Sequence, residues 1–128
     1  MAEKFYITTA IDYVNGPPHI GHAVQKVWAD VIARYRRLQG HEVWFLTGSD
    51  EHGATNVRAA EKMGITPQDL ADENSARFRA MKSALNLSWN DFIRTSDQEK
   101  HWPGAVLLWN KIVESGDFYK KNYRGLYC

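Results

Sequence analysis

The sequence predicts an α/β fold in the form of half of a doubly wound parallel sheet. Three segments have the β-branched and aromatic composition of buried strands, at residues 4–10, 42–47 and 91–95. Helical patterns lie between them. Strands that alternate with helices pair in parallel through right-handed crossovers, and sheets of this kind bind ligands at the carboxyl ends of their strands.

The first half of the chain is expected to form a strand, a turn, a long helix and a second strand. Residues 15–18 must turn after the first strand, because tandem proline neither continues a helix nor donates to a sheet. Residues 19–39 carry apolar side chains at helical spacing, which predicts an amphipathic helix with a buried apolar face. This face comprises Ile20, Val24, Val27, Trp28, Val31, Tyr35 and Leu38. A polar loop is expected at 48–53.

The second half is expected to add three helices and the third strand. A short helix at 55–63 ends at Gly64, and Thr66 then caps a helix that starts at Pro67 and runs to about residue 85. Its predicted buried side chains are Leu70, Phe78, Met81 and Leu85. Ser96 is expected to cap a last helix that ends near residues 115–116. We divide the chain at this point into a domain at 1–116 and the start of a second, connective domain at 117–128.

Composition and charge exclude several classes of protein. Hydrophobic residues make up 44% and aromatic residues 12% of 128 residues, enough for a packed core. Most of the Trp and Phe side chains are expected there, among them Trp28, Trp44, Phe45, Phe78, Phe92 and Trp109. Sixteen basic and fifteen acidic residues give a net charge of +1, which argues against a DNA wrapper or a polybasic membrane anchor. The single cysteine suits a reducing compartment, and we expect a cytoplasmic protein without a membrane partner.

His19 and His22 form the first candidate site. They would share one face of the opening turn of a helix, where free backbone N–H groups favour an anion. Gly21 would let a flat ligand approach the backbone. The pattern therefore predicts a phosphate site, in which two imidazoles donate hydrogen bonds that strengthen as charge develops. Two alternatives remain: ordinary surface or capping histidines, and half of a metal site that has only Asp12 nearby.

A second group of polar residues, Asp50, Glu51 and His52, follows the second strand. A carboxylate at this sheet edge could hold an ammonium group by charge-assisted hydrogen bonds. An ordinary polar loop, or a metallohydrolase cluster completed by His19 or His22, would also fit the pattern. Tyr13 with Ile11 precedes the first turn and would either contact a ligand or pack on the core.

The same residues resemble the class I aminoacyl-tRNA synthetases, and most specifically the bacterial type of methionyl-tRNA synthetase. Residues 5–23 are similar to the first signature of that class, with His-Ile-Gly-His at 19–22. Residues 40–53 resemble the second block of the methionine enzymes, and residues 91–95 resemble a later one. The resemblance extends in order along essentially the whole chain.

This resemblance implies the N-terminal catalytic part of a Rossmann-like, nucleotide-binding enzyme that joins methionine to ATP and passes the methionyl group to tRNA(Met). Mg²⁺ would assist. His19 and His22 match the catalytic, ATP-binding histidines, and Gly21 matches the glycine under the adenosine. Asp50 matches the acid that binds the methionine ammonium, and Ile11 and Tyr13 match positions of the methionine pocket.

The family also implies parts that this sequence lacks. Cys128 matches the first of four zinc ligands of the family, and one cysteine cannot hold zinc. A Lys-Met-Ser-Lys-Ser-like loop and an anticodon-binding domain are not found in the 128 residues. We therefore expect the isolated chain to bind ATP weakly and to charge tRNA at no useful rate.

Two other functions remain as alternatives. A small stand-alone nucleotidyltransferase with a His-x-Gly-His motif would transfer nucleotides by itself. A non-catalytic nucleotide- or protein-binding module would show no rate change on His→Asn substitution.

Overall fold

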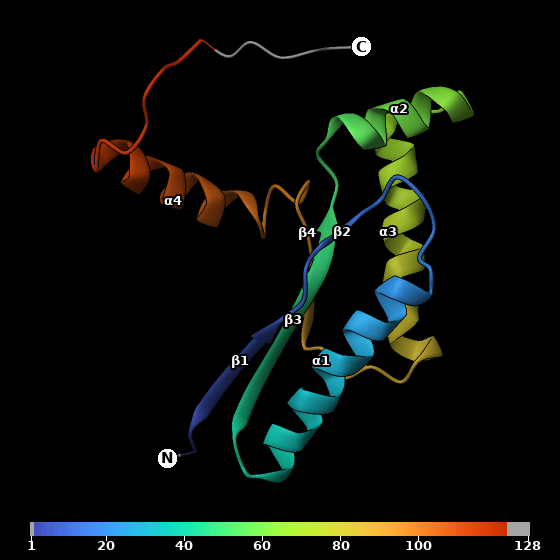
Figure 1. Cartoon of the computed structure of the whole chain (residues 1–128), viewed down its shortest axis with the longest axis vertical. Helices are drawn as coiled ribbons and strands as arrows, with labels where there is room; N and C mark the ends of the chain where they lie inside the picture. The colour runs from blue at the N-terminus through green and yellow to red at the C-terminus, as the bar shows by residue number, and fades with distance from the viewer. Residues whose placement is uncertain (1, 123–128) are drawn as a thin grey trace.

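The computed structural model describes residues 2–122 and forms an open sheet whose two longest helices lie on one side (Figure 1). The elements follow in the order β1 (Lys4–Thr8), β2 (Asp12–Tyr13), α1 (Ile20–Leu38), β3 (Glu42–Asp50), α2 (Ala54–Met63), α3 (Pro67–Ala84), β4 (Asp91–Arg94) and α4 (Trp102–Glu114). The order of strands and helices confirms the predicted α/β class. The proposed boundary at residue 116 stays a prediction; residues 117–122 form no helix or strand.

The long strand β3 organises the sheet, and every pairing within the described residues is parallel. β1 pairs along the first part of β3, with Lys4 opposite Glu42, and β2 pairs farther along, with Tyr13 opposite Asp50. β4 also pairs with β3, with Leu46 opposite Asp91. The carboxyl ends of β2, β3 and β4 therefore meet at the same edge, as a ligand-binding sheet of this class requires.

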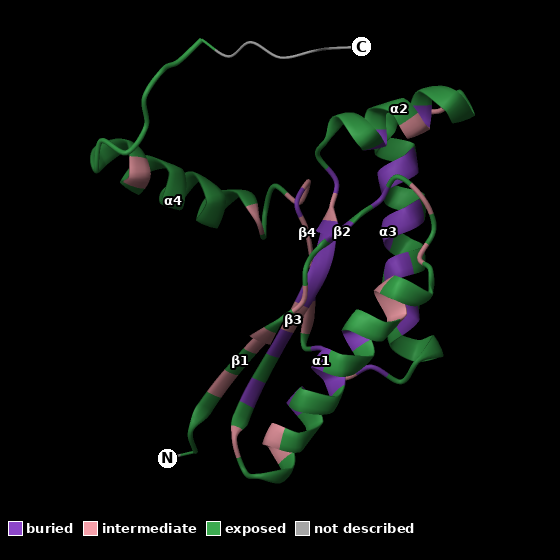
Figure 2. Ribbon diagram, viewed as in Figure 1, coloured by how far each residue is buried: buried purple, intermediate pink, exposed green. Residues whose placement is uncertain are grey.

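α1 and α3 lie on the same side of the sheet, as Figure 1 shows, and the core fills the space beneath them. Buried residues concentrate along β3 and on the inner sides of the two helices (Figure 2). The hydrophobic core consists of Val14, Ala29, Ala33, Val43, Phe45, Ala71, Phe78, Met81, Leu87, Trp89 and Phe92. Right-handed crossover connections place the connecting helices on one face of the sheet, as expected for half of a doubly wound fold.

The orientation predicted for α1 is wrong. Its apolar stripe faces outward, with Trp28 70% and Leu38 88% exposed, and the side toward the core carries Lys26, Ala29, Asp30 and Ala33. The small alanines let the helix approach the sheet closely. The two ionisable side chains are buried because each has a partner: Lys26 contacts Asp12, and Asp30 accepts hydrogen bonds from Ser88 and Arg34.

The prediction of a polar loop at 48–53 is also wrong for residues 48–50, because β3 continues to Asp50. The polar residues remain in the strand since β2 and β4 pair with its two edges. Gly48 permits the second pairing: a Cβ atom at this position would lie 2.2 Å from the carbonyl oxygen of Ile93. The close approach of β4 therefore depends on the missing side chain.

Helix boundaries agree with the sequence at some ends and not at others. Gly64 ends α2 with φ of 68°, and the Thr66 hydroxyl accepts the Asp69 N–H at the start of α3, as predicted. Leu85 is 42% exposed rather than buried, since α3 has ended one residue earlier. Ser96 does not cap α4. Its hydroxyl donates to the Glu51 carboxylate, and α4 begins after His101.

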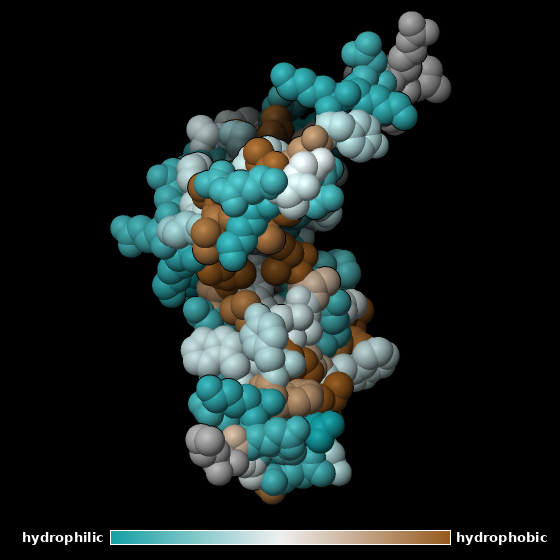
Figure 3. All heavy atoms as spheres, turned by 90° about the vertical axis from the view of Figure 1, so that its left-hand side faces the viewer, coloured by the Kyte–Doolittle hydropathy of each residue, from teal (hydrophilic) through white to brown (hydrophobic). Residues whose placement is uncertain are grey.

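α4 extends away from the sheet, and its apolar side chains are exposed. Val106, Leu107, Leu108, Trp109 and Val113 are each more than half exposed. Hydrophobic residues gather on the corresponding face of the molecule (Figure 3). Trp28, Trp44 and Trp109 therefore lie outside the core predicted for them, whereas Phe45, Phe78 and Phe92 are buried as expected. Within residues 2–122, none of the helices is both long and apolar enough to span a membrane.

Candidate functional site

A cavity of about 340 Å³ lies where the chain passes from β2 into α1. It is lined by Ile11, Asp12, Tyr13, Asn15, Gly16, Pro17, His19 and His22. Four of the residues predicted from the sequence are thus brought together: Ile11, Tyr13, His19 and His22. The cavity is adjacent to the carboxyl edge of the sheet, where the topology places a ligand site.

The two histidines of this cavity stack on each other. Their ring centroids are 3.7 Å apart at an interplanar angle of 29°. The Gly21 N–H donates to His19 Nδ1 and the His19 N–H donates to His22 Nδ1, each at 3.1 Å. Both Nδ1 atoms are therefore acceptors, so Nε2 is the ring nitrogen that carries a proton in each histidine. The arrangement leaves Nε2–H of each ring as the donor, with Nε2 of His22 3.9 Å from Asp12 Oδ1.

His22 is the more enclosed ring of the pair, since it also packs edge-on against Phe78 with 5.0 Å between centroids. Burial lowers the pKa of His22 below 6.5, against the opposing effect of the Asp12 carboxylate, and His19 and Lys26 lower it further. The imidazole is thus predominantly neutral at pH 7. A neutral ring still donates through Nε2, so it binds a phosphate oxygen by hydrogen bonding rather than by charge.

Gly21 does not line the cavity in this structure. A Cβ atom at Gly21 would lie 3.0 Å from Cε1 and 3.1 Å from Nδ1 of His19, so the His19 ring fills the space beside the glycine. The absence of a side chain at residue 21 lets this ring fold back over the helix start. The predicted adenosine contact at Gly21 remains a prediction.

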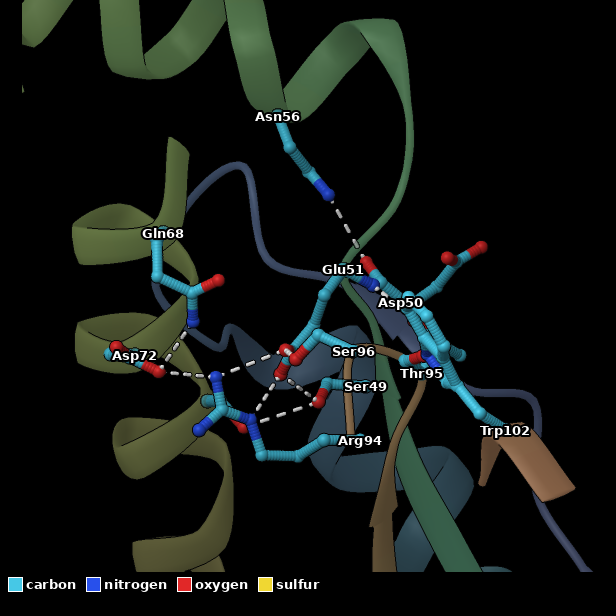
Figure 4. A network of polar contacts seen from close by, with 11 residues as sticks. Ser49, Asp50, Glu51, Asn56, Gln68, Asp72, Arg94, Thr95, Ser96 and Trp102 are labelled. Atoms are coloured by element: carbon cyan, nitrogen blue, oxygen red, sulfur yellow. Dashed lines mark hydrogen bonds and ion pairs between the residues drawn. The ribbon is translucent and has the colours of Figure 1, made fainter. Parts of the chain in front are cut away.

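Asp50, the predicted ammonium ligand, lies beside the cavity rather than in its lining. It is half-buried at the end of β3, directly opposite Tyr13 of β2. Figure 4 shows its carboxylate pointing away from the side chain of Glu51, the residue that follows β3. Asn56 donates to the Asp50 carbonyl at 3.1 Å and joins this strand end to α2. Asp50 is therefore joined to the cavity through its pairing with Tyr13, which lines it.

A network around Glu51 and Arg94 fixes the carboxyl ends of β3 and β4, and the sequence patterns did not predict it (Figure 4). Arg94 donates from Nε and Nη2 to the two oxygens of the Glu51 carboxylate, at 2.7 and 3.0 Å. The second partner of Arg94 is Asp72 of α3. Burial raises the pKa of Glu51, but hydrogen bonds from Arg94, Ser96 and Ser49 outweigh it and hold the pKa below its usual value. Only the resemblance around residues 91–95 pointed to this strand end.

A hydrogen bond from α3 holds the other side of the cavity. The buried Asn74 amide donates to the Val14 carbonyl at 2.7 Å, between the lining residues Tyr13 and Asn15. Val14 is fully buried, so its carbonyl needs a hydrogen-bond partner within the protein. The position of the 14–18 turn is therefore set by a helix sixty residues farther along the chain.

The geometry does not support a cluster of metal ligands. Within residues 2–122 no group of three His, Cys, Asp or Glu side chains is placed to hold a metal ion. His52 lines a different hollow, together with Trp102 and Trp109 near α4. The zinc ligand predicted at Cys128 lies outside the described residues.

Fold and cavity together define the nucleotide-binding half-sheet of a class I synthetase, with paired histidines at the start of its first helix. Residues 5–128 match the family model described as tRNA synthetases class I (M). The chain belongs to this family.

Relatives and solved structures agree with this assignment. The chain is 51% identical over 125 residues to the methionine–tRNA ligase of Brucella melitensis and 52% identical over 123 residues to that of Rhizobium meliloti. These matches cover 98% and 96% of the chain but 24% of each relative. The methionyl-tRNA synthetase of Mycobacterium tuberculosis, solved in complex with methionyl-adenylate, superimposes with a TM-score of 0.91 at 44% identity, over 94% of this chain and 24% of that one. The comparisons give no support to a stand-alone nucleotidyltransferase.

Proposed function

We propose that this chain is part of an enzyme that activates methionine with ATP and transfers it to tRNA(Met). The chain would supply the histidines that bind ATP and the carboxylate that binds methionine. The observation that carries the proposal is the single cavity shared by Ile11, Tyr13, His19 and His22. The methionine–tRNA ligases among the relatives and the solved methionyl-adenylate complex support the same substrates. The cytoplasm stays the predicted location, on the ground of the single cysteine.

The reaction suits this site because it needs no general base. The carboxylate of an amino acid is ionised at pH 7 and can attack the α-phosphorus directly. Catalysis then consists of holding the two reactants in line and stabilising the charge that develops on phosphate oxygens. The proposal assigns the second task to the Nε2–H donors of His19 and His22, and the binding of the amino acid's ammonium group to Asp50.

Mg²⁺ is expected to arrive with the triphosphate, whose charge it would neutralise in part. Phosphate oxygens of the nucleotide, water and one or two carboxylates are the usual ligands of such an ion. In the proposal, this chain positions the two reactants and donates hydrogen bonds to the phosphate oxygens. The zinc site of the family remains a prediction tied to Cys128.

Methionine-dependent ATP–pyrophosphate exchange by the full-length gene product tests the proposal. We expect His19→Asn and His22→Asn each to lower kcat by about 10²-fold, because the shorter Asn amide does not reach the position from which Nε2–H donates to the developing charge. His41→Asn is the matched control, since His41 lies at the other end of β3. Exchange independent of methionine, or unchanged in both histidine variants, would contradict the proposed function.

A further inference from the structure

Two charged side chains next to the histidines have no role in the proposed chemistry. Lys26 of α1 is fully buried, and Asp12 of β2 is 6% exposed. The Lys26 ammonium donates directly to Asp12 Oδ2. Burying such a pair is costly compared with an apolar pair of similar size. Its position beside the cavity points to a role there.

Asp12 faces both the lysine and the catalytic histidine. Its Oδ1 atom lies 3.9 Å from His22 Nε2, while Oδ2 binds Lys26. Asp12 is also one of the residues that line the cavity. The carboxylate therefore stands between a buried cation and the nitrogen that would donate to a phosphate.

The remaining surroundings of His22 fix the direction of the ring. Its Nδ1 accepts the His19 N–H, one face stacks on the His19 ring, and Phe78 of α3 closes the edge. Asp12, Lys26 and His19 are the titratable groups that act on His22. With Nδ1 occupied, Nε2 is directed toward Asp12 and the cavity.

A lone carboxylate at this place would oppose the proposed function in two ways. It would repel the phosphates of the nucleotide, and it would favour the protonated form of His22. Lys26 lies in direct contact with the carboxylate and cancels its charge. The pair as a whole is neutral. Asp12 can therefore face His22 as a hydrogen-bond acceptor without adding a net negative charge to the cavity.

We propose that Lys26 and Asp12 form a charge-balanced positioning pair, which directs the Nε2–H of His22 and keeps the cavity open to a triphosphate. This inference rests on the proposed function and assigns to it two positioning residues, neither of which needs to contact the reacting atoms.

Three variants of the full-length gene product test the pair. Lys26→Gln keeps a hydrogen-bond donor to Asp12 but leaves its charge unbalanced. Asp12→Asn with Lys26→Gln makes the pair neutral again. Arg34→Gln is the control, because Arg34 pairs with Asp30 on the same helix away from the cavity.

In the exchange assay, Lys26→Gln is expected to raise KM for ATP by about tenfold, through like-charge repulsion. The neutral double variant is expected to return KM to within about threefold of wild type, as a compensated pair should. Arg34→Gln should leave KM unchanged although it lowers the unfolding temperature. Equal KM increases in the single and double variants would overturn the proposal. The double variant carries no unpaired buried charge, so loss of ATP affinity there contradicts the proposal even where Lys26→Gln fails to fold.

NMR titration of the histidine side chains gives a readout that does not depend on activity. The pKa of His22 should rise in Lys26→Gln and fall again in the double variant. An unchanged pKa in both variants would overturn the inference. Wild-type protein without methionine-dependent exchange would instead contradict the proposed function, while this titration would still test the pair.

Discussion

Tyr13 and Asp50 lie directly opposite each other in the parallel pairing of β2 with β3. Partners in adjacent parallel strands share one face of the sheet. Tyr13 lines the histidine cavity, so the pairing brings the Asp50 carboxylate to the edge of that cavity without placing it in the lining. The amino acid and the nucleotide would therefore bind at neighbouring positions along one strand pair.

The ammonium contact proposed for Asp50 predicts a selective loss of methionine affinity. We expect Asp50→Asn to raise KM for methionine by about 10- to 100-fold, because a charge-assisted hydrogen bond is replaced by a neutral one. KM for ATP should change far less. Glu61→Gln, which removes an exposed carboxylate from α2, is the control. Steady-state exchange kinetics with each substrate varied in turn measure the difference, and an equal rise in both KM values would contradict the assignment.

The Glu51–Arg94 pair predicts a large loss of stability when the arginine is removed. The Glu51 side chain is 1% exposed, so Arg94→Met would leave a buried carboxylate without its cation. We expect the free energy of unfolding to fall by about 3–5 kcal/mol. Arg77→Met removes the exposed Arg77–Glu73 pair and should cost about 0.5 kcal/mol. Urea unfolding measures both, and similar losses in the two variants would contradict the structural role of the buried pair.

The same pair predicts how stability depends on pH. The pKa of Glu51 is lower in the folded chain than its ordinary value of 4.5. The unfolded chain therefore binds a proton more readily, and stability falls as pH drops below 4.5 toward the folded pKa. Asp30 and Asp72, whose pKa values are also lowered, add to the same acid-side loss. Urea unfolding over an acid pH series should show this slope. Glu51→Gln should reduce it, and a variant with the wild-type slope would refute the prediction.

Gly48 predicts a backbone effect at the junction of β3 and β4. A methyl group at this residue would overlap the Ile93 carbonyl, so Gly48→Ala must push the strands apart. We expect a loss of about 2 kcal/mol or more in the free energy of unfolding. Gly104→Ala is the matched control, because its added methyl group meets nothing within 4 Å in α4. It should stabilise the helix by about 0.5–1 kcal/mol. In thermal unfolding, the midpoint temperature should fall for Gly48→Ala and rise for Gly104→Ala.

Local signals in the sequence predicted much of the fold. Gly64, Thr66 and Pro67 determine helix ends through their own backbone and side chains, so they are visible without tertiary structure. The cavity residues Ile11, Tyr13, His19 and His22 were found because they surround one turn. Topology then placed that turn at the correct sheet edge.

Features that depend on distant partners were missed. Helical periodicity shows that α1 has an apolar stripe but not which side of the helix meets the sheet, and buried Lys26 becomes acceptable only through Asp12. β2 contains two residues and exists because β3 offers an edge at Ser49 and Asp50. Likewise, Ser96 is a residue type that often caps helices, but its hydroxyl donates to Glu51, which follows β3 and lies far away in the sequence.

The hydrogen bond between Asn74 and the Val14 carbonyl couples α3 to the shape of the proposed binding cavity, although this helix contributes no side chain to its lining. Substitutions that rotate or shift α3 would change the conformation of the 14–18 turn, which precedes the two histidines. Searches for altered substrate selectivity or inhibitor resistance should therefore include this helix as well as the residues in reach of the ligand.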